Sequence, residues 1–234
     1  MSLDINLYAE HPDKYIELQN LRPDYHAAIE KTVFLSLKYL KNKEKISIAD
    51  FCGGIGNVTK KISKQTPISK ATIIDINKEF LNIAESSGIE AEILEALHSD
   101  IIDIKLKKEF DLILLVFAYH HIPDDKKRKY LNIALDGLKE NGLLVLTEIY
   151  LPNQYITKKY YEKLLEEIPV KNLLLENFLQ ETADSTEFEF KVAKEFADKE
   201  LKSLGFREIE SIRIWPLDKT FDSNIGTFVQ IFTN

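Results

Sequence analysis

One short stretch of the sequence could bind a nucleotide-like ligand. An apolar run at residues 46–49 ends in Asp50, and Gly53, Gly54 and Gly56 follow before an amphipathic run begins. This order is typical of a strand, a tight turn and the start of a helix. Glycines let the backbone approach a ligand closely, and the first N–H groups of a helix carry partial positive charge. A tight turn without a ligand is the alternative, because short glycine motifs are not specific.

Three more carboxylates stand at or just beyond the ends of predicted strands: Asp75, Asp100 and Glu148. In a parallel sheet the carboxyl ends of the strands share one edge, where ligands bind. We therefore expect these side chains to surround one site together with Asp50. For Asp100, a helix or turn cap is the competing interpretation.

Two adjacent histidines, His120 and His121, follow the most apolar predicted strand, residues 110–118. An imidazole at such a position could act as a base near neutral pH. The alternative is that the pair is structural and binds the backbone at the turn. No group of histidine, cysteine and carboxylate residues has the spacing of a metal site, so we expect no metal.

Strands and helices alternate along the chain, which predicts a doubly wound α/β fold. Periodicity and turn residues predict strands near 46–50, 71–76, 91–97, 110–118, 143–149, 208–214 and 226–232, and helices near 23–40, 57–66, 78–87, 123–139, 153–167, 171–180 and 186–204. We expect a single domain spanning 1–234, made of an N-terminal arm and helix (1–44), a core (45–150), a helical cap (151–204) and a final strand pair (205–234).

Composition narrows the class of protein. The net charge of −7 and the pI near 5.4 disfavour a general nucleic-acid partner. Cys52 is the only cysteine, so no internal disulfide is expected and a cytoplasmic location is favoured. The first residues lack the features of a signal peptide, and no apolar run is long enough for a membrane span.

The chain resembles class I S-adenosylmethionine-dependent methyltransferases of the small-molecule, UbiE-like group. Its glycine stretch is similar to the first motif of that family, although Cys52 stands where the first glycine is usual. The apolar strand with the histidine pair and residues 138–148 resemble the two motifs that follow. Val58 stands where a dinucleotide-dependent oxidoreductase would need another glycine, which disfavours that class. The resemblance implies a Rossmann-like, seven-stranded, mostly parallel sheet with an N-terminal helical lid and a helical insertion after the fifth strand.

The resemblance also implies S-adenosylmethionine as cofactor. It assigns Asp75 to the ribose hydroxyls, Ile76 to the adenine face, and Asp100 with Ile101 to the adenine edge. Arg22, on the N-terminal arm, could pair with the carboxylate of the cofactor. The complete predicted set of cofactor contacts is Asp50, Cys52, Gly53, Gly54, Gly56, Asp75, Ile76, Asp100, Ile101, Phe117, His121 and Arg22.

The expected activity is methyl transfer to a small molecule, at oxygen or nitrogen. His120, Tyr119 and Glu148 are the candidate catalytic residues, with His120 as the candidate base. Tyr8, Tyr15 and Tyr25 are candidates for a lid, with a solvated arm as the alternative. A cofactor-binding module that lacks transferase activity and acts through partners is the competing function. The sequence leaves a homodimer open.

Overall fold

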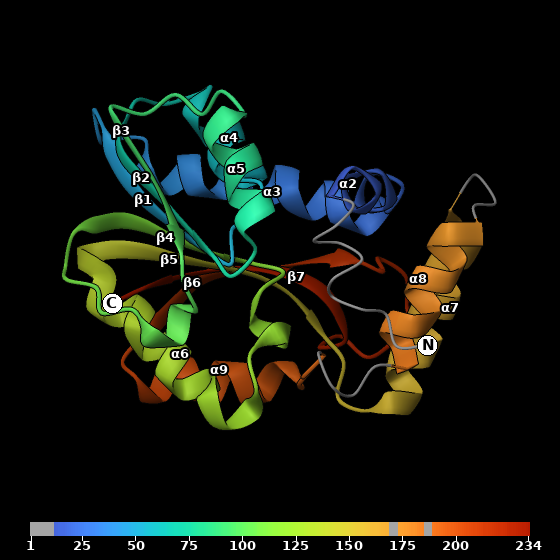
Figure 1. Ribbon diagram of the computed structural model, residues 1–234. Coiled ribbons are helices and arrows are strands. Elements are labelled where there is room, and N and C mark those ends of the chain that lie inside the picture. The colour runs from blue at the N-terminus through green and yellow to red at the C-terminus, as the bar shows by residue number, and fades with distance from the viewer. Residues whose placement is uncertain (1–11, 169–172, 185–188) are drawn as a thin grey trace.

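The computed structural model describes residues 12–168, 173–184 and 189–234, which form a seven-stranded sheet in the order β3-β2-β1-β4-β5-β7-β6 (Figure 1). Both pairs that involve β7 are antiparallel, and the other pairs are parallel. The strands are β1 (Ile46–Phe51), β2 (Ile68–Asp75), β3 (Ile93–His98), β4 (Phe110–Val116), β5 (Leu138–Tyr150), β6 (Arg207–Trp215) and β7 (Gly226–Thr233). The predicted Rossmann-like, mostly parallel sheet is confirmed.

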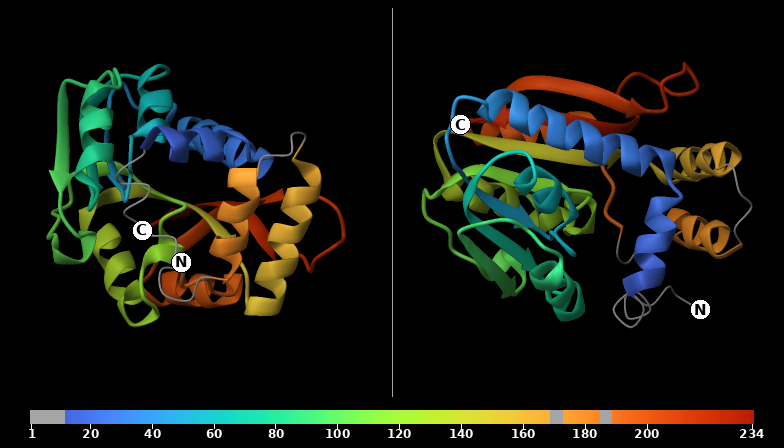
Figure 2. Two further views of the ribbon diagram at one scale, coloured as in Figure 1. Left: turned by 45° about the vertical axis from the view of Figure 1, so that its right-hand side comes forward. Right: turned by 90° about the horizontal axis from the view of Figure 1, so that it is seen from above.

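Helices cover both faces of the sheet, and a helical pair stands beside its carboxyl ends (Figures 1 and 2). One face carries α3, α4 and α5, and the other carries α6 and α9. The helices are α2 (Pro12–Asn20), α3 (Pro23–Leu40), α4 (Asn57–Ser63), α5 (Lys78–Ser86), α6 (Asp124–Gly137), α7 (Gln154–Glu167), α8 (Leu173–Asp184) and α9 (Lys194–Ser203), with short 3-10 turns η1 (Ile101–Asp103) and η2 (Tyr119–His121).

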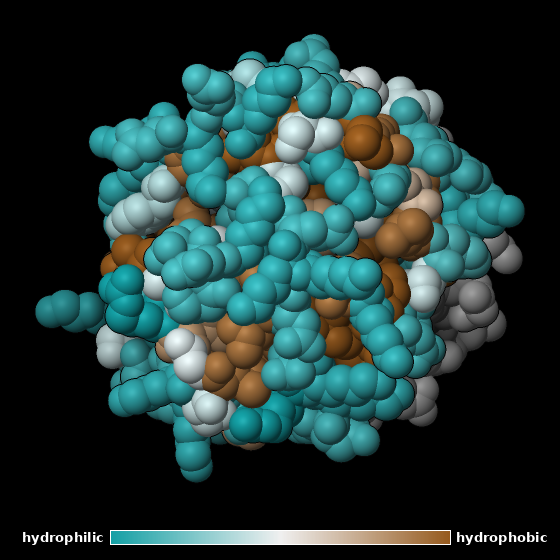
Figure 3. Space-filling model, turned by 90° about the vertical axis from the view of Figure 1, so that its left-hand side faces the viewer, coloured by the Kyte–Doolittle hydropathy of each residue, from teal (hydrophilic) through white to brown (hydrophobic). Residues whose placement is uncertain are grey.

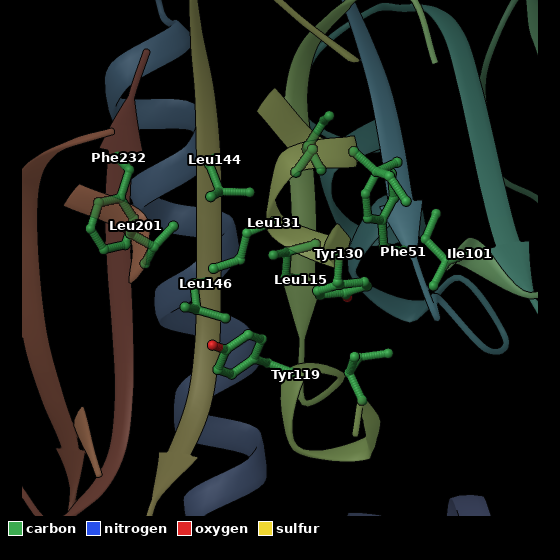
Figure 4. Close-up of a cluster of buried hydrophobic side chains, with 14 of the residues drawn as sticks. Phe51, Ile101, Leu115, Tyr119, Tyr130, Leu131, Leu144, Leu146, Leu201 and Phe232 are labelled. Carbon is green, nitrogen blue, oxygen red and sulfur yellow. The ribbon is translucent and has the colours of Figure 1, made fainter. Parts of the chain in front are cut away.

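The apolar strands form the centre of the molecule because both of their faces are covered. On β4, Leu112 and Leu114 face α3 and α4, whereas Ile113 and Leu115 face α6. Alternate side chains of one strand thus enter two different cores, which explains the nearly continuous apolar run. Tyr119 belongs to the core on the α6 side of the sheet and lies beside Leu146 (Figure 4).

The N-terminal segment is joined to the rest of the chain by a buried polar network. Arg22 donates to both carboxylate oxygens of Asp24, at 3.2 and 2.8 Å, and Asp24 also accepts from the hydroxyl of Tyr160 on α7. The same hydroxyl lies 2.6 Å from Thr227 on β7. The network therefore connects the start of α3 with the helical insertion and the final strand. Tyr8 and the side chain of Tyr15, two predicted lid residues, lie outside the described part.

The two largest differences from the predicted element boundaries concern β5 and α9. Strand β5 begins at Leu138 instead of 143, because its pairing with β4 jumps from Leu138 to Leu143. Asn141, inside this irregularity, has a left-handed φ of 57°. Helix α9 begins at Lys194, and residues 189–193, which were predicted to be helical, have no regular secondary structure; the predicted start at 186 lies outside the described residues. Helical spacing places Phe34 of α3 near the buried Ile29 and Val33, yet Phe34 is exposed.

The surface is consistent with the acidic, polar composition. The face shown in Figure 3 is mostly hydrophilic, with smaller hydrophobic patches between the polar side chains. No helix within the described ranges is long and apolar enough to cross a membrane.

Candidate active site

A cavity of about 930 Å³ lies at the carboxyl ends of the parallel strands. The turns after β1, β2 and β4 form its floor, and α2, α7 and α8 contribute to its walls. This is where doubly wound sheets bind ligands. The helical insertion therefore encloses the same space that the strand ends define.

The glycine turn is built on Asp50. This buried carboxylate accepts a hydrogen bond of 2.7 Å from the hydroxyl of Thr59 on α4. Burial raises the pKa of Asp50 to about 7, and the Thr59 hydrogen bond opposes that rise. A Cβ on Gly53 would lie 2.7 Å from the Asp50 carboxyl carbon, so glycine is required there. Cys52 adopts a left-handed φ of 53°, which explains why a glycine is usual at this position of the motif.

Asp75 lines the cavity and holds the neighbouring turns by hydrogen bonds. Its two carboxylate oxygens accept 2.8 Å hydrogen bonds from the backbone N–H groups of Gly54 and Asn77. Burial raises the pKa of Asp75, and these two hydrogen bonds oppose the rise. The next residue, Ile76, is 64% exposed at the edge of the cavity, so an apolar surface is presented to any bound ring.

Asp100 lines the cavity and also caps the η1 turn, because its carboxylate accepts from the N–H of Ile102 at 3.0 Å. The capping role that the sequence left open is therefore present. Ile101 is buried and lines the same wall. Phe117 has a left-handed φ of 51° and stacks on Tyr25, with ring centroids 5.4 Å apart.

His120 and Glu148 form a buried pair beneath the cavity. Three donors converge on the Glu148 carboxylate: the N–H of His120 at 3.0 Å, the N–H of Ile149 at 2.6 Å, and Nδ1 of His120 at 2.6 Å. A carboxylate that receives three donors is best satisfied when it is ionised and Nδ1 carries the proton. The pair therefore leaves Nε2 of His120 as the acceptor nitrogen, on the side away from Glu148.

Burial also determines the protonation of this pair. It lowers the pKa of His120 well below its usual range, and the neighbouring His121 adds to this effect. Burial likewise raises the pKa of Glu148 to about 7, against the hydrogen bonds from Ile149 and His120. A neutral imidazole is therefore the resting form of His120 near pH 7.

The extended segment 189–193 brings a further carboxylate to the histidines. The N–H of Phe190 donates to the carbonyl of His120 at 2.6 Å, and the buried Lys127 donates to the carbonyl of Phe190 at 2.8 Å. Glu189 consequently lies 3.7 Å from Nε2 of His120 and 3.9 Å from Nδ1 of His121.

Most of the predicted site residues meet at this cavity, but three do not line it. Tyr119 is fully buried in the core, so it is not placed to touch an acceptor. Glu148 lies behind His120 and can act only through it. Gly56 has a φ of 69° and packs against Ile73, which shapes the turn. Arg22 does line the cavity, but its charge is already paired with Asp24.

The sequence interpretation missed Glu189 and Lys127. Residues 187–192 alternate charged and apolar side chains, which is the pattern of an extended segment. That alternation was read as part of a helix. Lys127 carried no signal, because a lysine in a predicted basic-faced helix is normally solvated.

Comparisons with known proteins agree with this fold. Residues 48–142 match the methyltransferase domain family. A demethylmenaquinone methyltransferase of Chlamydia caviae is 22% identical over 222 residues, covering 82% of this chain and 95% of that protein. The structure of an S-adenosylmethionine-dependent methyltransferase from Clostridium acetobutylicum superposes with a TM-score of 0.65 at 16% identity, covering 97% of this chain and 98% of the other.

A second solved structure is the Burkholderia thailandensis 1,6-didemethyltoxoflavin-N1-methyltransferase with bound 1,6-didemethyltoxoflavin and S-adenosylhomocysteine. It gives a TM-score of 0.61 at 14% identity and covers 98% of this chain and 88% of that one. These likenesses show the fold of class I methyltransferases. Together with the family match over residues 48–142 and the curated relatives, they support a class I S-adenosylmethionine-dependent methyltransferase.

Proposed function

We propose that this enzyme methylates a small molecule, at an oxygen or nitrogen atom, inside the cavity of about 930 Å³. The observation that carries the proposal is the shape of this cavity. It extends from the glycine turn and Asp75 to His120, Glu189 and the helical insertion, within one continuous space. Its volume is near the upper end of the range for small-molecule sites, which suits a cofactor together with a small acceptor.

The cofactor end is formed by residues of the first three strand ends. The glycine turn offers a close backbone approach, and each oxygen of Asp75 retains a lone pair for a ribose hydroxyl. Exposed Ile76 would pack on the adenine face, Asp100 would accept from its amino group, and the backbone N–H of Ile101 would donate to its edge. Cys52, Phe117, His121 and Arg22 would line the methionine part. When bound, S-adenosylmethionine supplies an electrophilic methyl group on a sulfonium sulfur.

The acceptor end is formed by His120, Glu189 and Phe190, with Phe178 and Thr182 from α8. We assign His120 as the base: Nε2 receives the acceptor proton, while Glu148 holds the proton on Nδ1 and fixes the ring. Glu148 is thus a positioning residue. The walls of the cavity hold the acceptor in line with the donor, which is the main requirement of a displacement reaction.

Charge and relatives support a small acceptor over a nucleic acid. The net charge of −7 disfavours binding to a phosphate backbone. The two relatives named above act, by their names, on demethylmenaquinone and on 1,6-didemethyltoxoflavin, which are both small molecules. We also propose a cytosolic location. A homodimer remains a prediction from the sequence.

The test is the release of S-adenosylhomocysteine from S-adenosylmethionine over pools of small hydroxyl and amine compounds. Turnover on at least one pool is expected. Binding of the cofactor without turnover on any pool would contradict the proposal and favour the inactive module.

With an acceptor in hand, His120→Gln is expected to lower turnover by about 10²-fold or more. His26→Gln is the matched control, because His26 is exposed and its Nε2 bonds to the carbonyl of Asn20. S-adenosylhomocysteine affinity should be unchanged in both variants. A His120→Gln rate within about threefold of wild type would make His120 structural instead.

A further inference from the structure

Three metal-ligating side chains meet at the acceptor end of the cavity, although the sequence spacing predicted no metal site. His120, His121 and Glu189 each offer a donor atom, and these atoms all lie within 4.8 Å of one another. His120 and His121 are adjacent in sequence, whereas Glu189 arrives from a distant extended segment. Only the tertiary structure brings the set together, so no spacing rule could have found it.

The contact between His120 and Glu189 brings a ring nitrogen and a carboxylate close together. Glu148 holds the His120 proton on Nδ1, so Nε2 presents a lone pair. Oε2 of Glu189 lies 3.7 Å away and also pairs with Lys191, whereas Oε1 lies 3.9 Å from Nδ1 of His121. A cation placed between Nε2 of His120 and Oε1 of Glu189 would give both acceptors a partner.

The arrangement behind His120 is that of a metal ligand. Histidines that bind metals donate their other ring nitrogen to a carboxylate, which fixes the tautomer and the ring orientation. Glu148 makes this contact at 2.6 Å and is itself held by two backbone N–H groups. The support that a metal-binding imidazole needs is therefore already built, beneath the cavity and out of solvent.

We infer that His120, His121 and Glu189 form a site for a divalent transition-metal ion of the zinc type. Two imidazoles and one carboxylate suit Zn²⁺ or Co²⁺, whereas Mg²⁺ and Ca²⁺ prefer oxygen ligands alone. Ligands at about 2.1 Å around a tetrahedral ion lie about 3.4 Å apart. Oε1 of Glu189 lies 3.9 Å from Nδ1 of His121, so this contact would shorten by about half an ångström, and the three donor atoms all lie within 4.8 Å of one another. His121 is half-exposed, which leaves its ring room to adjust.

Lys191 does not block the proposed metal site. Its ammonium pairs with Oε2 of Glu189, whereas Oε1 is the oxygen that faces His121. The lysine also lies 5.5 Å from the ring of Tyr161, so it approaches the carboxylate from the wall of the cavity. One carboxylate oxygen is therefore available to an ion without displacing the lysine.

A bound ion would occupy the Nε2 lone pair that the proposed function gives to the acceptor proton. Metal and proton would compete for one atom, so filling the site is expected to slow methyl transfer. This consequence depends on the proposed function, whereas the binding itself does not. Binding is therefore the primary readout.

The experiment is calorimetric titration of the tag-free protein with Zn²⁺, supported by the visible absorption of bound Co²⁺. Wild type is expected to bind one equivalent, and His121→Ala and Glu189→Gln should each weaken binding about tenfold or more. His26→Ala, which removes an imidazole outside the cluster, should bind as wild type does. Circular dichroism and thermal unfolding confirm that each variant is folded.

Absence of stoichiometric Zn²⁺ binding by wild type would overturn the inference. So would equal affinities for wild type, His121→Ala and Glu189→Gln, which would indicate scattered surface sites. If the rate of methyl transfer were unchanged when metal fully occupies the site, the idea that metal and proton compete for Nε2 of His120 would be overturned. The acceptor assay on the metal-free enzyme tests the proposed function separately.

Discussion

Replacing Asp75 by Asn tests the cofactor end of the site with the smallest change in shape. Each carboxylate oxygen already accepts one backbone N–H at 2.8 Å, from Gly54 or Asn77. Its remaining lone pairs are those proposed to bind the ribose hydroxyls. In the Asp75→Asn variant one oxygen becomes an NH₂ group that points a donor at a donor. Asp75 is only 9% exposed, so water cannot easily replace the lost interaction.

Losing a hydrogen bond to a charged, buried acceptor costs about 1.5–3 kcal/mol. This corresponds to a rise of about 10- to 150-fold in Kd. Calorimetry with S-adenosylhomocysteine measures it without turnover, and Asp103→Asn, on an exposed carboxylate of the η1 turn, is the control. Thermal unfolding without ligand shows whether the substitution also destabilises the turn itself, apart from its effect on binding. An Asp75→Asn affinity within about threefold of wild type would refute the assignment.

Three further changes test the framework. Gly56→Ala should destabilise the protein more than Gly88→Ala. Both glycines have a left-handed φ, but only at Gly56 would the added Cβ meet neighbouring atoms, at 2.7 and 2.8 Å. Equal melting temperatures of the two variants would contradict this crowding. Asp111→Asn should lose about 1–3 kcal/mol in urea unfolding at pH 7. Although burial opposes it, hydrogen bonds from two lysines and Ser47 hold the pKa of Asp111 well below its usual range in the folded protein. The loss should therefore shrink as the pH falls below about 4, where the carboxylate of the unfolded chain takes up a proton and the folded one does not; a pH-independent difference would disprove this origin. Lys127→Met should leave the Phe190 carbonyl unpaired and speed proteolysis of residues 189–193, and unchanged cleavage would show that Lys127 does not hold this segment.

Local patterns made most of the fold predictable. The apolar run of β4 and the glycine turn after β1 are dictated by neighbouring residues, and both stand where the sequence placed them. The start of β5 was not predictable, because the irregular pairing around Asn141 depends on the partner strand. Phe34 shows a similar limit: a helical wheel places it near Ile29 and Val33 but does not show how far the sheet extends beneath α3.

The residues of the site also divide into those that the sequence predicts and those that it does not. Asp50 and Asp75 follow their strands directly, so their meeting at one edge could be inferred from order alone. Glu189 could not, because its position depends on hydrogen bonds that Phe190 makes with His120 and Lys127. Tyr119 was a candidate because it adjoins the histidine pair, yet the 3-10 turn points it into the core (Figure 4). Residues that come from distant segments are the ones a single sequence does not reveal.

A crystal structure with bound S-adenosylhomocysteine tests the central claim most directly. The account predicts the ribose hydroxyls on Asp75, the adenine beside Ile76, and the sulfur facing the side of the cavity that holds His120 and Glu189. A nucleoside bound away from Asp75, or a sulfur directed away from His120, would contradict it.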